Sequence, residues 1–333
     1  MNFGLNLRNF MADPQRPIHD QIEETAELLN LGERLGFWGA YAPEHWVSHP
    51  TKWIHPMPLL GRLAAASSKA KLITGVLLMP LHNPVDIAEQ TTALDQISNG
   101  RFILGLGLGY REKELEIVGS NRAERVGRLE ESIELMKMLW SGEEATYRGR
   151  YFRATGARIG VRPVQSPRPP IWLACQGRRA AGRAARIADA CLVGPYVSWA
   201  DHDSLAGIYW EELDKTGGRD DGFFAAHRCI SLASDRETAI REARETAETT
   251  ASLYGGWGMQ ERTAVDLGLD KLRNLEEWAI VGDAEQCTEV IADQRDKSQS
   301  GYMAFTFLNL PDALPARREY LQRVWEEALS RLA

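Results

Sequence analysis

The sequence predicts an α/β fold, a (β/α)8 TIM barrel with insertions, formed as a single domain over residues 1–333. Short apolar segments typical of strands alternate along the chain with longer segments of helical periodicity. Eight such strands occur, and their nearly continuous apolar runs suit burial on both faces, as in parallel βα units. A closed barrel takes about 250 residues, so the surplus predicts insertions, near 142–169 and 250–280. An open doubly wound sheet is the alternative, because counting strands does not show closure.

The expected elements follow one another in a regular order along the chain. The strands are expected at 2–7, 37–42, 71–79, 101–109, 171–175, 189–194, 227–233 and 302–307. The clearest helices are expected at 19–35, 58–68, 84–97, 122–141 and 312–332. The first helix should end at Gly36, since glycine commonly follows the last helical residue.

Composition excludes several classes of function. The formal net charge is -7, with 39 basic and 46 acidic residues, which argues against binding to nucleic acid or to an anionic membrane surface. No secretory signal or membrane-spanning run is visible. The four cysteines are dispersed without zinc-site spacing, so we expect a cytoplasmic protein with reduced thiols.

The segment SNGRFILGLGLGY (98–110) raises the question of a dinucleotide-binding loop. Its glycines, Gly105, Gly107 and Gly109, are spaced by two, which is the period of a strand, whereas the dinucleotide motif needs G-x-G-x-x-G. Three glycines on one face of a strand would leave a flat strip against which a planar ligand can lie. The alternative is that they only relieve crowding inside the barrel.

Several segments together resemble the bacterial luciferase-like flavin-dependent monooxygenases. The longest match is LLMPLHNPVDIAEQTTALDQISNGRFILGLGLGY (77–110), and shorter ones are FWGAYAPEHW, ERVGRLEESIELMKMLW, RPVQSPRPPIWLAC and VGDAEQC. The resemblance spans almost the whole chain. It implies a TIM barrel, usually dimeric, that binds FMN or a deazaflavin coenzyme.

The resemblance also implies roles for individual residues. His45 matches the active-site histidine of the family, and Gly75-Val76 match a site where many members have a cis peptide bond that presses on the flavin ring. Arg125 matches a position that pairs with the flavin phosphate. The remaining cofactor residues expected from the resemblance are Asn83, Gly107, Tyr110, Gly177, Arg178 and Arg179. The last three open a helix, whose positive end suits a phosphate.

Substrate-pocket residues are expected where aromatic side chains follow strands or lie in the second insertion. These candidates are Trp46, Trp53, His227, Tyr254 and Trp257. The glycines of SLYGGWG (252–258) would permit a hinged lid. Relatives that attack sulfonates have an arginine and a histidine on the seventh strand, where this chain has His227 and Arg228, so a sulfonate substrate stays open.

A metal site is not expected. His45, His49 and His55 are spaced by four and six in a loop, and no acidic residue at a matching strand end is expected to complete the set. Glu44 is read either as the group that orients His45 or as a solvated carboxylate.

The sequence therefore predicts an oxidoreductase, a flavin-dependent monooxygenase that is the oxygenase component of a two-component system. Reduced FMN would come from a transient NAD(P)H-dependent flavin reductase, and one oxygen atom of dioxygen would enter a small organic substrate. His45 would accept a proton from substrate or hydrogen-bond the oxygenated flavin. The protein is expected to be a homodimer or higher homo-oligomer. The alternatives are a deazaflavin-dependent dehydrogenase or reductase and a non-catalytic flavin-binding protein.

Overall fold

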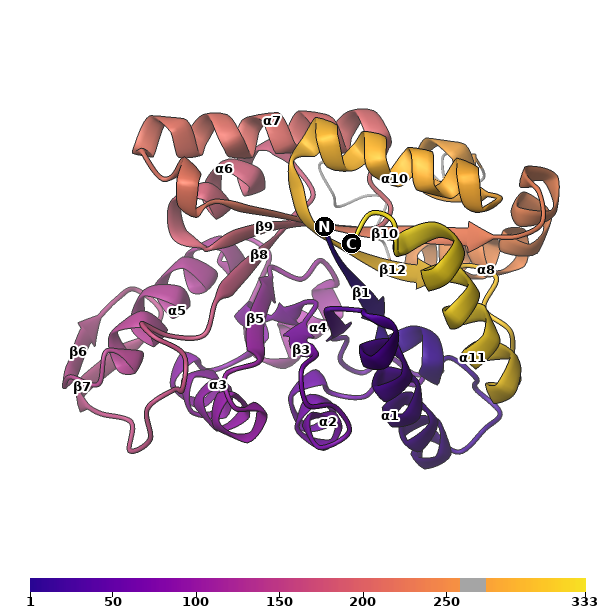
Figure 1. Ribbon diagram of the computed structural model, residues 1–333. Helices are drawn as coiled ribbons and strands as arrows, with labels where there is room; N and C mark the ends of the chain where they lie inside the picture. The colour runs from indigo at the N-terminus through magenta and orange to yellow at the C-terminus, as the bar shows by residue number, and fades with distance from the viewer. Residues whose placement is uncertain (258–273) are drawn as a thin grey trace.

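A closed barrel of eight parallel strands forms the centre of the molecule, so the predicted (β/α)8 fold is confirmed (Figure 1). The computed structural model describes residues 1–257 and 274–333. Around the barrel the strands are β1 (Asn2–Asn6), β2 (Gly39–Ala42), β3 (Lys71–Thr74), β5 (Phe102–Gly107), β8 (Ile171–Cys175), β9 (Ala190–Val193), β10 (Phe223–Leu232) and β12 (Ser300–Phe307). Pairing of β9 with β10 and of β12 with β1 closes the circle, which rules out the open sheet.

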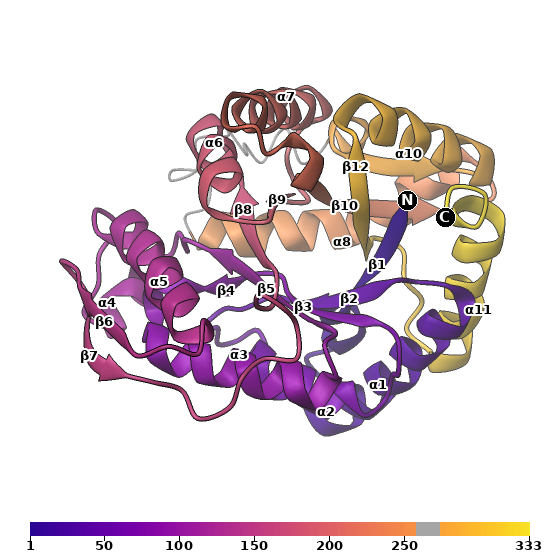
Figure 2. The ribbon, with the colours of Figure 1, turned by 60° about the vertical axis from the view of Figure 1, so that its left-hand side comes forward.

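Helices cover the outside of the barrel (Figure 2). They are α1 (Ile18–Leu35), α2 (Pro56–Ala64), α3 (Pro84–Ser98), α4 (Glu112–Ile117), α5 (Arg125–Trp140), α6 (Arg178–Ile187), α7 (Trp199–Thr216), α8 (Arg236–Gly256), α10 (Ala284–Ser298) and α11 (Leu314–Arg323). The 3-10 helices are η1 (Leu7–Met11), η2 (Met79–Leu81), η3 (Arg219–Asp221) and η4 (Leu275–Glu277), and the π-helix η5 (Val324–Leu329) continues α11. As expected, α1 is followed by Gly36, whose φ is 122°.

Aromatic side chains fill the interior of the barrel. Trp38 and Trp172 stack with ring centroids 6.2 Å apart, and Tyr302 packs against both at 5.3 Å. Tyr41 and Ile103 belong to the same buried cluster. Because this cluster plugs the barrel, a ligand can enter only at an end, and in TIM barrels the carboxyl ends of the strands form the site.

Some strand boundaries differ from the prediction. The expected strand 71–79 is interrupted, because Gly75-Val76 bulge out between β3 and a short strand β4 (Leu77–Leu78), and η2 follows directly. The expected strand 101–109 ends at Gly107, so the alternation of the three glycines does not continue to Gly109, whose φ is +70°. The strand β11 (Ala279–Gly282), which was not expected, pairs with the carboxyl half of β10.

The two regions expected as insertions have different structures. Residues 142–169 contain an antiparallel hairpin, β6 (Ala145–Arg148) and β7 (Arg153–Ala157), apart from the barrel sheet. Residues 250–256 are the last turns of α8 rather than a loop. Residues 258–273, with Gly258 of the expected lid, lie outside the described residues.

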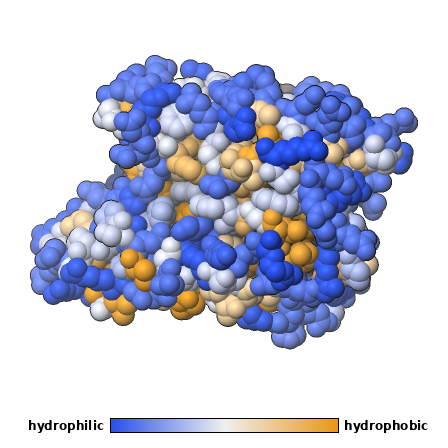
Figure 3. Space-filling model, viewed as in Figure 1, coloured by the Kyte–Doolittle hydropathy of each residue, from blue (hydrophilic) through white to orange (hydrophobic). Residues whose placement is uncertain are grey.

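The surface in the view of Figure 3 is mostly hydrophilic, with small hydrophobic patches. Among the described helices, none has both the length and the apolar character needed to span a membrane. All four cysteines, Cys175, Cys191, Cys229 and Cys287, are free and buried.

Candidate functional site

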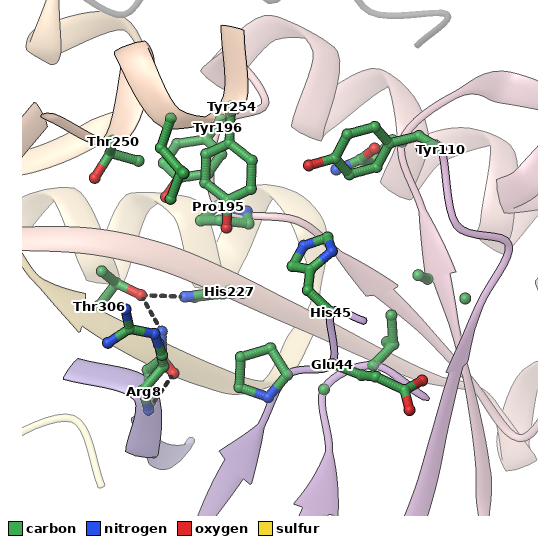
Figure 4. Close-up of a pocket in the computed structure, with 18 of the residues that line it drawn as sticks. Arg8, Glu44, His45, Tyr110, Pro195, Tyr196, His227, Thr250, Tyr254 and Thr306 are labelled. Carbon is green, nitrogen blue, oxygen red and sulfur yellow. Dashed lines mark hydrogen bonds between the residues drawn. The ribbon is translucent and has the colours of Figure 1, made fainter. Parts of the chain in front are cut away.

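A cavity of about 1580 Å³ opens at the carboxyl ends of the barrel strands. Its lining includes Arg8 after β1, His45 after β2, Tyr110 after β5, Gly177 after β8 and Thr306 in β12. Small-molecule sites commonly measure about 300–1,000 Å³, so this space exceeds that of a single drug-sized ligand. Residues of α8, among them Tyr254, close it on one side (Figure 4).

His45 is held at the cavity by a buried carboxylate. Its Nδ1 lies 3.0 Å from Oε1 of Glu114 on α4, which also accepts hydrogen bonds from the Trp46 backbone N–H at 3.0 Å and from Arg111 Nη1 at 2.8 Å. The side chains of His45 and Glu114 are only 8% and 1% exposed. Because a carboxylate can only accept, Nδ1 donates, and Nε2 is left as the atom that can take a proton.

Aromatic rings surround His45. The ring centroids of Trp53, Tyr110 and Trp257 lie 4.8, 5.7 and 4.7 Å from that of His45, and that of Tyr254 lies at 6.3 Å. Arg111 adds a cation–π contact, with Cζ 4.1 Å from the centre of the Trp257 ring. We call the part of the cavity next to His45, Trp53 and Tyr254 the aromatic chamber.

The chain bulges at Gly75-Val76, whose peptide bond is cis, and this bulge packs against the glycines of β5. A Cβ on Gly105 would lie 1.9 Å from the Thr74 carbonyl oxygen, and one on Gly107 would lie 2.5 Å from a methyl of Val76. The expectation of an open glycine strip was therefore wrong at Gly105, which is buried beneath the bulge. Gly75, Val76 and Gly107 do line the cavity, so the bulge itself forms part of its wall.

The part of the cavity near the carboxyl end of β8 is positively charged. It is lined by Gly177, Arg178 and Arg179 at the start of α6, together with Arg125 and Arg183. No side chain caps the N-terminus of α6, so its first N–H groups are available to an anion. Arg125 Nη1 donates to the carbonyl of Gly109 at 2.5 Å, which ties α5 to the segment that carries Tyr110. We call this region the α6 cationic end.

His227 lines the cavity from β10 and is held by neighbouring hydroxyls. Its ring nitrogens are hydrogen-bonded to the Tyr41 hydroxyl and to Thr306 Oγ1, the latter at 2.6 Å (Figure 4). Burial and the nearby charge of Arg228 lower the pKa of His227 to about 3. It is therefore neutral at physiological pH and offers no positive charge to a ligand.

Both expectations for Glu44 were wrong. It is buried and does not contact His45; its carboxylate accepts hydrogen bonds from the Leu78 N–H and from Trp46 Nε1, and it pairs with His55 and His82 at 3.0 Å. Burial would raise the pKa of Glu44, but the hydrogen bonds from His55 and His82 hold it well below its usual range.

The prediction that no acidic residue at a strand end would complete a histidine set was also wrong: Glu44 closely follows β2 and lies with His55 and His82, although not with His45 and His49. Atoms of Glu44, His55 and His82 that could bind a metal ion lie within 4.8 Å of one another. The two histidines are also the residues that pair with this carboxylate.

Three other predicted residues lie outside the cavity lining. Asn83 is exposed and caps α3, its Oδ1 accepting from the Val85 N–H at 2.9 Å. Trp46 packs against His82, with ring centroids 5.3 Å apart. Trp257 contacts the His45 ring without belonging to the lining.

Sequence reasoning missed Arg8 and Glu114. Arg8 comes two residues after β1, so the rule that barrel sites gather at the carboxyl ends of strands could have identified it. Glu114 lies on a short helix 69 residues from His45, and no local pattern joins the two.

The chain is similar to flavin-dependent and F420-dependent enzymes. The F420-dependent glucose-6-phosphate dehydrogenase of Microbacterium testaceum is 29% identical over 332 residues, covering 92% of this chain and 93% of that protein. The oxygenase component of the flavin-dependent trigonelline monooxygenase of Acinetobacter baylyi is 28% identical over 178 residues. This match covers 53% of this chain and about half, 49%, of that relative.

Among solved structures, the oxygenating constituent of 3,6-diketocamphane monooxygenase from Pseudomonas putida, in complex with FMN, has the same fold. It superposes with a TM-score of 0.83 at 18% identity, covering 100% of this chain and 99% of that one. The family model described as luciferase-like monooxygenase matches residues 1–299. The chain thus belongs to the luciferase-like monooxygenase family, whose members are oxidoreductases that include monooxygenases and F420-dependent dehydrogenases.

Proposed function

We propose that this protein is the oxygenase component of a two-component flavin-dependent monooxygenase that uses reduced FMN and dioxygen to oxygenate a small organic substrate. The observation that carries the proposal is that one cavity joins the α6 cationic end to the aromatic chamber around His45. A flavin mononucleotide has the same two parts, a phosphate and a broad apolar ring. The trigonelline monooxygenase relative supports this choice among the activities of the family.

The residues present fit FMN. Gly177, Arg178 and Arg179 would hold the phosphate through helix N–H groups and guanidinium groups. The bulge at Gly75-Val76 and the backbone of Gly107 would form the wall against the ring. When bound, reduced FMN supplies two electrons to dioxygen, so that one oxygen atom enters the substrate, the other leaves as water, and FMN is released oxidised.

The protein's own contribution is to position the reactants, move a proton and exclude water. His45 Nε2 is the ring nitrogen that is left to accept or return a proton, while the hydrogen bond between Nδ1 and Glu114 fixes the orientation of the ring. Trp53, Tyr110 and Tyr254 line the cavity there and limit the access of water to the reacting groups.

The proposed reaction implies protein partners. An NAD(P)H-dependent flavin reductase would supply reduced FMN through a transient encounter, as the term "oxygenase component" in the name of the trigonelline relative suggests. We also infer that the protein is a homodimer or a higher homo-oligomer. The exposed side chains of Ile97, Val161 and Val164 lie on adjoining segments, and Gln96 bonds the Arg162 carbonyl between them. Light scattering during size-exclusion chromatography would measure the mass in solution.

A deazaflavin-dependent dehydrogenase is the second candidate. The F420-dependent relative matches 92% of this chain, and a histidine held by a buried carboxylate suits removal of a proton from an alcohol during hydride transfer. The same cavity would then hold coenzyme F420 at the same end.

Cofactor titration followed by rapid mixing with dioxygen tests the proposal. We expect reduced FMN to bind anaerobically, and its oxidation by dioxygen to follow a different time course from that of free reduced FMN. Arg179→Gln should weaken FMN binding by about 10-fold, because one charge-assisted contact is lost. Binding of F420 without binding of FMN would favour the dehydrogenase, and binding of neither would refute both candidates.

A further inference from the structure

Two buried hydrogen-bond donors beside the aromatic chamber have no acceptor. Nε and Nη1 of Arg8 are buried, and neither has a hydrogen-bond partner within residues 1–257 and 274–333. Nε1 of Trp53 is likewise buried without a hydrogen-bond partner among the described residues. Cζ of Arg8 lies 5.1 Å from the centre of the Trp53 ring. Guanidinium and indole N–H groups can only donate. Buried donors ordinarily find an acceptor, so this pair indicates that a ligand supplies one.

The acidic residues of the same cavity do not satisfy Arg8. Glu242, Glu245 and Asp312 belong to the lining, yet none of them is a hydrogen-bond partner of Arg8 Nε or Nη1. Glu242 instead accepts from Asn309 Nδ2 at 2.9 Å. The Arg8 backbone N–H donates to Asn6 Oδ1 at 3.0 Å, which anchors this residue at the start of η1.

The position of Arg8 in the barrel separates it from the cofactor phosphate. Around the closed sheet β1 lies four strands from β8 in either direction, so Arg8 and the α6 cationic end are on opposite sides. A phosphate held at α6 is therefore on the far side of the barrel from Arg8. The acceptor for Arg8 is then expected to belong to the substrate.

Arg8 and His45 are close enough to serve one small molecule. Both lie against Trp53, the Arg8 guanidinium carbon at 5.1 Å and the His45 ring at 4.8 Å from its centre. Figure 4 shows Arg8 and Thr306 on one side of the cavity and Tyr196 and Tyr254 on the other. The two tyrosine rings, 5.5 Å apart, add an apolar wall.

We propose that the substrate is a small organic anion whose acidic group binds Arg8 and the Trp53 indole N–H, while its apolar part faces His45. This inference rests on the proposed function and names its substrate class. A buried guanidinium without an acidic partner attracts an anionic group strongly, because few competing waters surround it. Carboxylates, sulfonates and phosphates share this chemistry.

Calorimetric titration with ligands that share one ring tests the proposal. The probes are benzoate, benzenesulfonate and phenyl phosphate, each compared with neutral benzamide, on the full chain with FMN present. We expect at least one anion to bind about 10-fold or more tightly than benzamide, in the range of a charge-assisted hydrogen bond. The anion that binds best would identify the acidic group. No preference for any anion over benzamide would overturn the proposal.

Variants decide whether Arg8 is the cause of that preference. Arg8→Gln should reduce the preferred anion's affinity at least about 10-fold, to the level of benzamide, and Arg8→Lys should retain part of the preference. Trp53→Phe keeps a ring but removes the N–H, so it should also weaken anion binding. Arg331→Gln removes an exposed charge and should change nothing. A preference that survives both Arg8→Gln and Trp53→Phe would contradict the proposal.

FMN binding separates this inference from the proposed function. Arg8→Gln should bind FMN as the unaltered protein does, since Arg8 is opposite the phosphate end. If the unaltered protein fails to bind FMN, the proposed function fails. The anion preference can still be measured without flavin, and its loss in Arg8→Gln would stand as a separate result.

Discussion

At the scale of single residues, the proposed function depends on a proton-transfer group, His45, whose ring is held by a buried carboxylate. Glu114 Oε1 receives three donors, from His45, Trp46 and Arg111, while its Oε2 is buried without a partner. The carboxylate therefore orients the imidazole, while Glu114 itself does not belong to the cavity lining. In the proposed function its role is positioning, whereas His45, which lines the cavity, would act on the reacting groups.

Replacing His45 by Gln should lower turnover with substrate by roughly 10²–10⁴-fold, the usual contribution of a general acid–base group. FMN affinity should change little, because the phosphate end lies elsewhere. Steady-state turnover and FMN titration on the same preparation measure both quantities. Unchanged turnover would remove His45 from the mechanism.

Replacing Glu114 by Gln should lower turnover less than His45→Gln does, because Gln still offers an oxygen acceptor that can orient the His45 ring. Gln lacks the negative charge of the carboxylate. It would also leave Arg111 without its carboxylate, so a loss of stability of about 3–5 kcal/mol is expected. Steady-state turnover and denaturant unfolding measure the two effects, and a loss of turnover as large as that of His45→Gln would contradict a positioning role for Glu114.

At the scale of elements, the fit between β5 and the bulge at Gly75-Val76 depends on missing side chains. Gly105→Ala should destabilise the protein by roughly 1–3 kcal/mol or more, because its Cβ would lie 1.9 Å from the Thr74 carbonyl oxygen. Gly207→Ala is the matched control. It lies within α7 with no atom within 4 Å of the added Cβ, so helix propensity should stabilise it by about 0.5–1 kcal/mol. Thermal unfolding of both variants checks the contrast.

How far the sequence predicts the structure also follows from these elements. The barrel was predictable because eight buried strands each carry a strong apolar run. The bulge was not, because Lys71 to Met79 reads as one apolar strand and only the close approach of β5 reveals the interruption. The hydrogen-bond partner of His45 could not be predicted either. The sequence suggests the adjacent Glu44, but in the folded chain the partner is Glu114 on α4.

At the scale of the whole molecule, neutral buried histidines make folding sensitive to acid. Burial first, and then the charge of Arg228, lower the pKa of His202 to about 4. In the unfolded chain this histidine becomes protonated as the pH falls below about 6.5, whereas in the folded chain it becomes protonated only near pH 4. The free energy of unfolding should therefore fall as the pH is lowered from about 6.5 to about 4.

His202→Gln should reduce this fall by roughly 2–3 kcal/mol, as the size of the pKa shift implies. Denaturant unfolding at pH 7 and at pH 4.5 measures the difference, with replacement of the exposed His19 by Gln as the control. Equal slopes with pH for the unaltered protein and His202→Gln would contradict this origin of acid sensitivity.

The aromatic chamber also gives the protein an optical reporter. Trp53 and Trp257 lie beside His45, and their emission overlaps the absorption of an oxidised flavin placed in the same cavity. Excitation energy would pass from these two indoles to the flavin and quench their fluorescence. Occupancy can thus be read in real time from the unlabelled chain, with Trp53→Phe and Trp257→Phe showing how much of the signal each indole contributes.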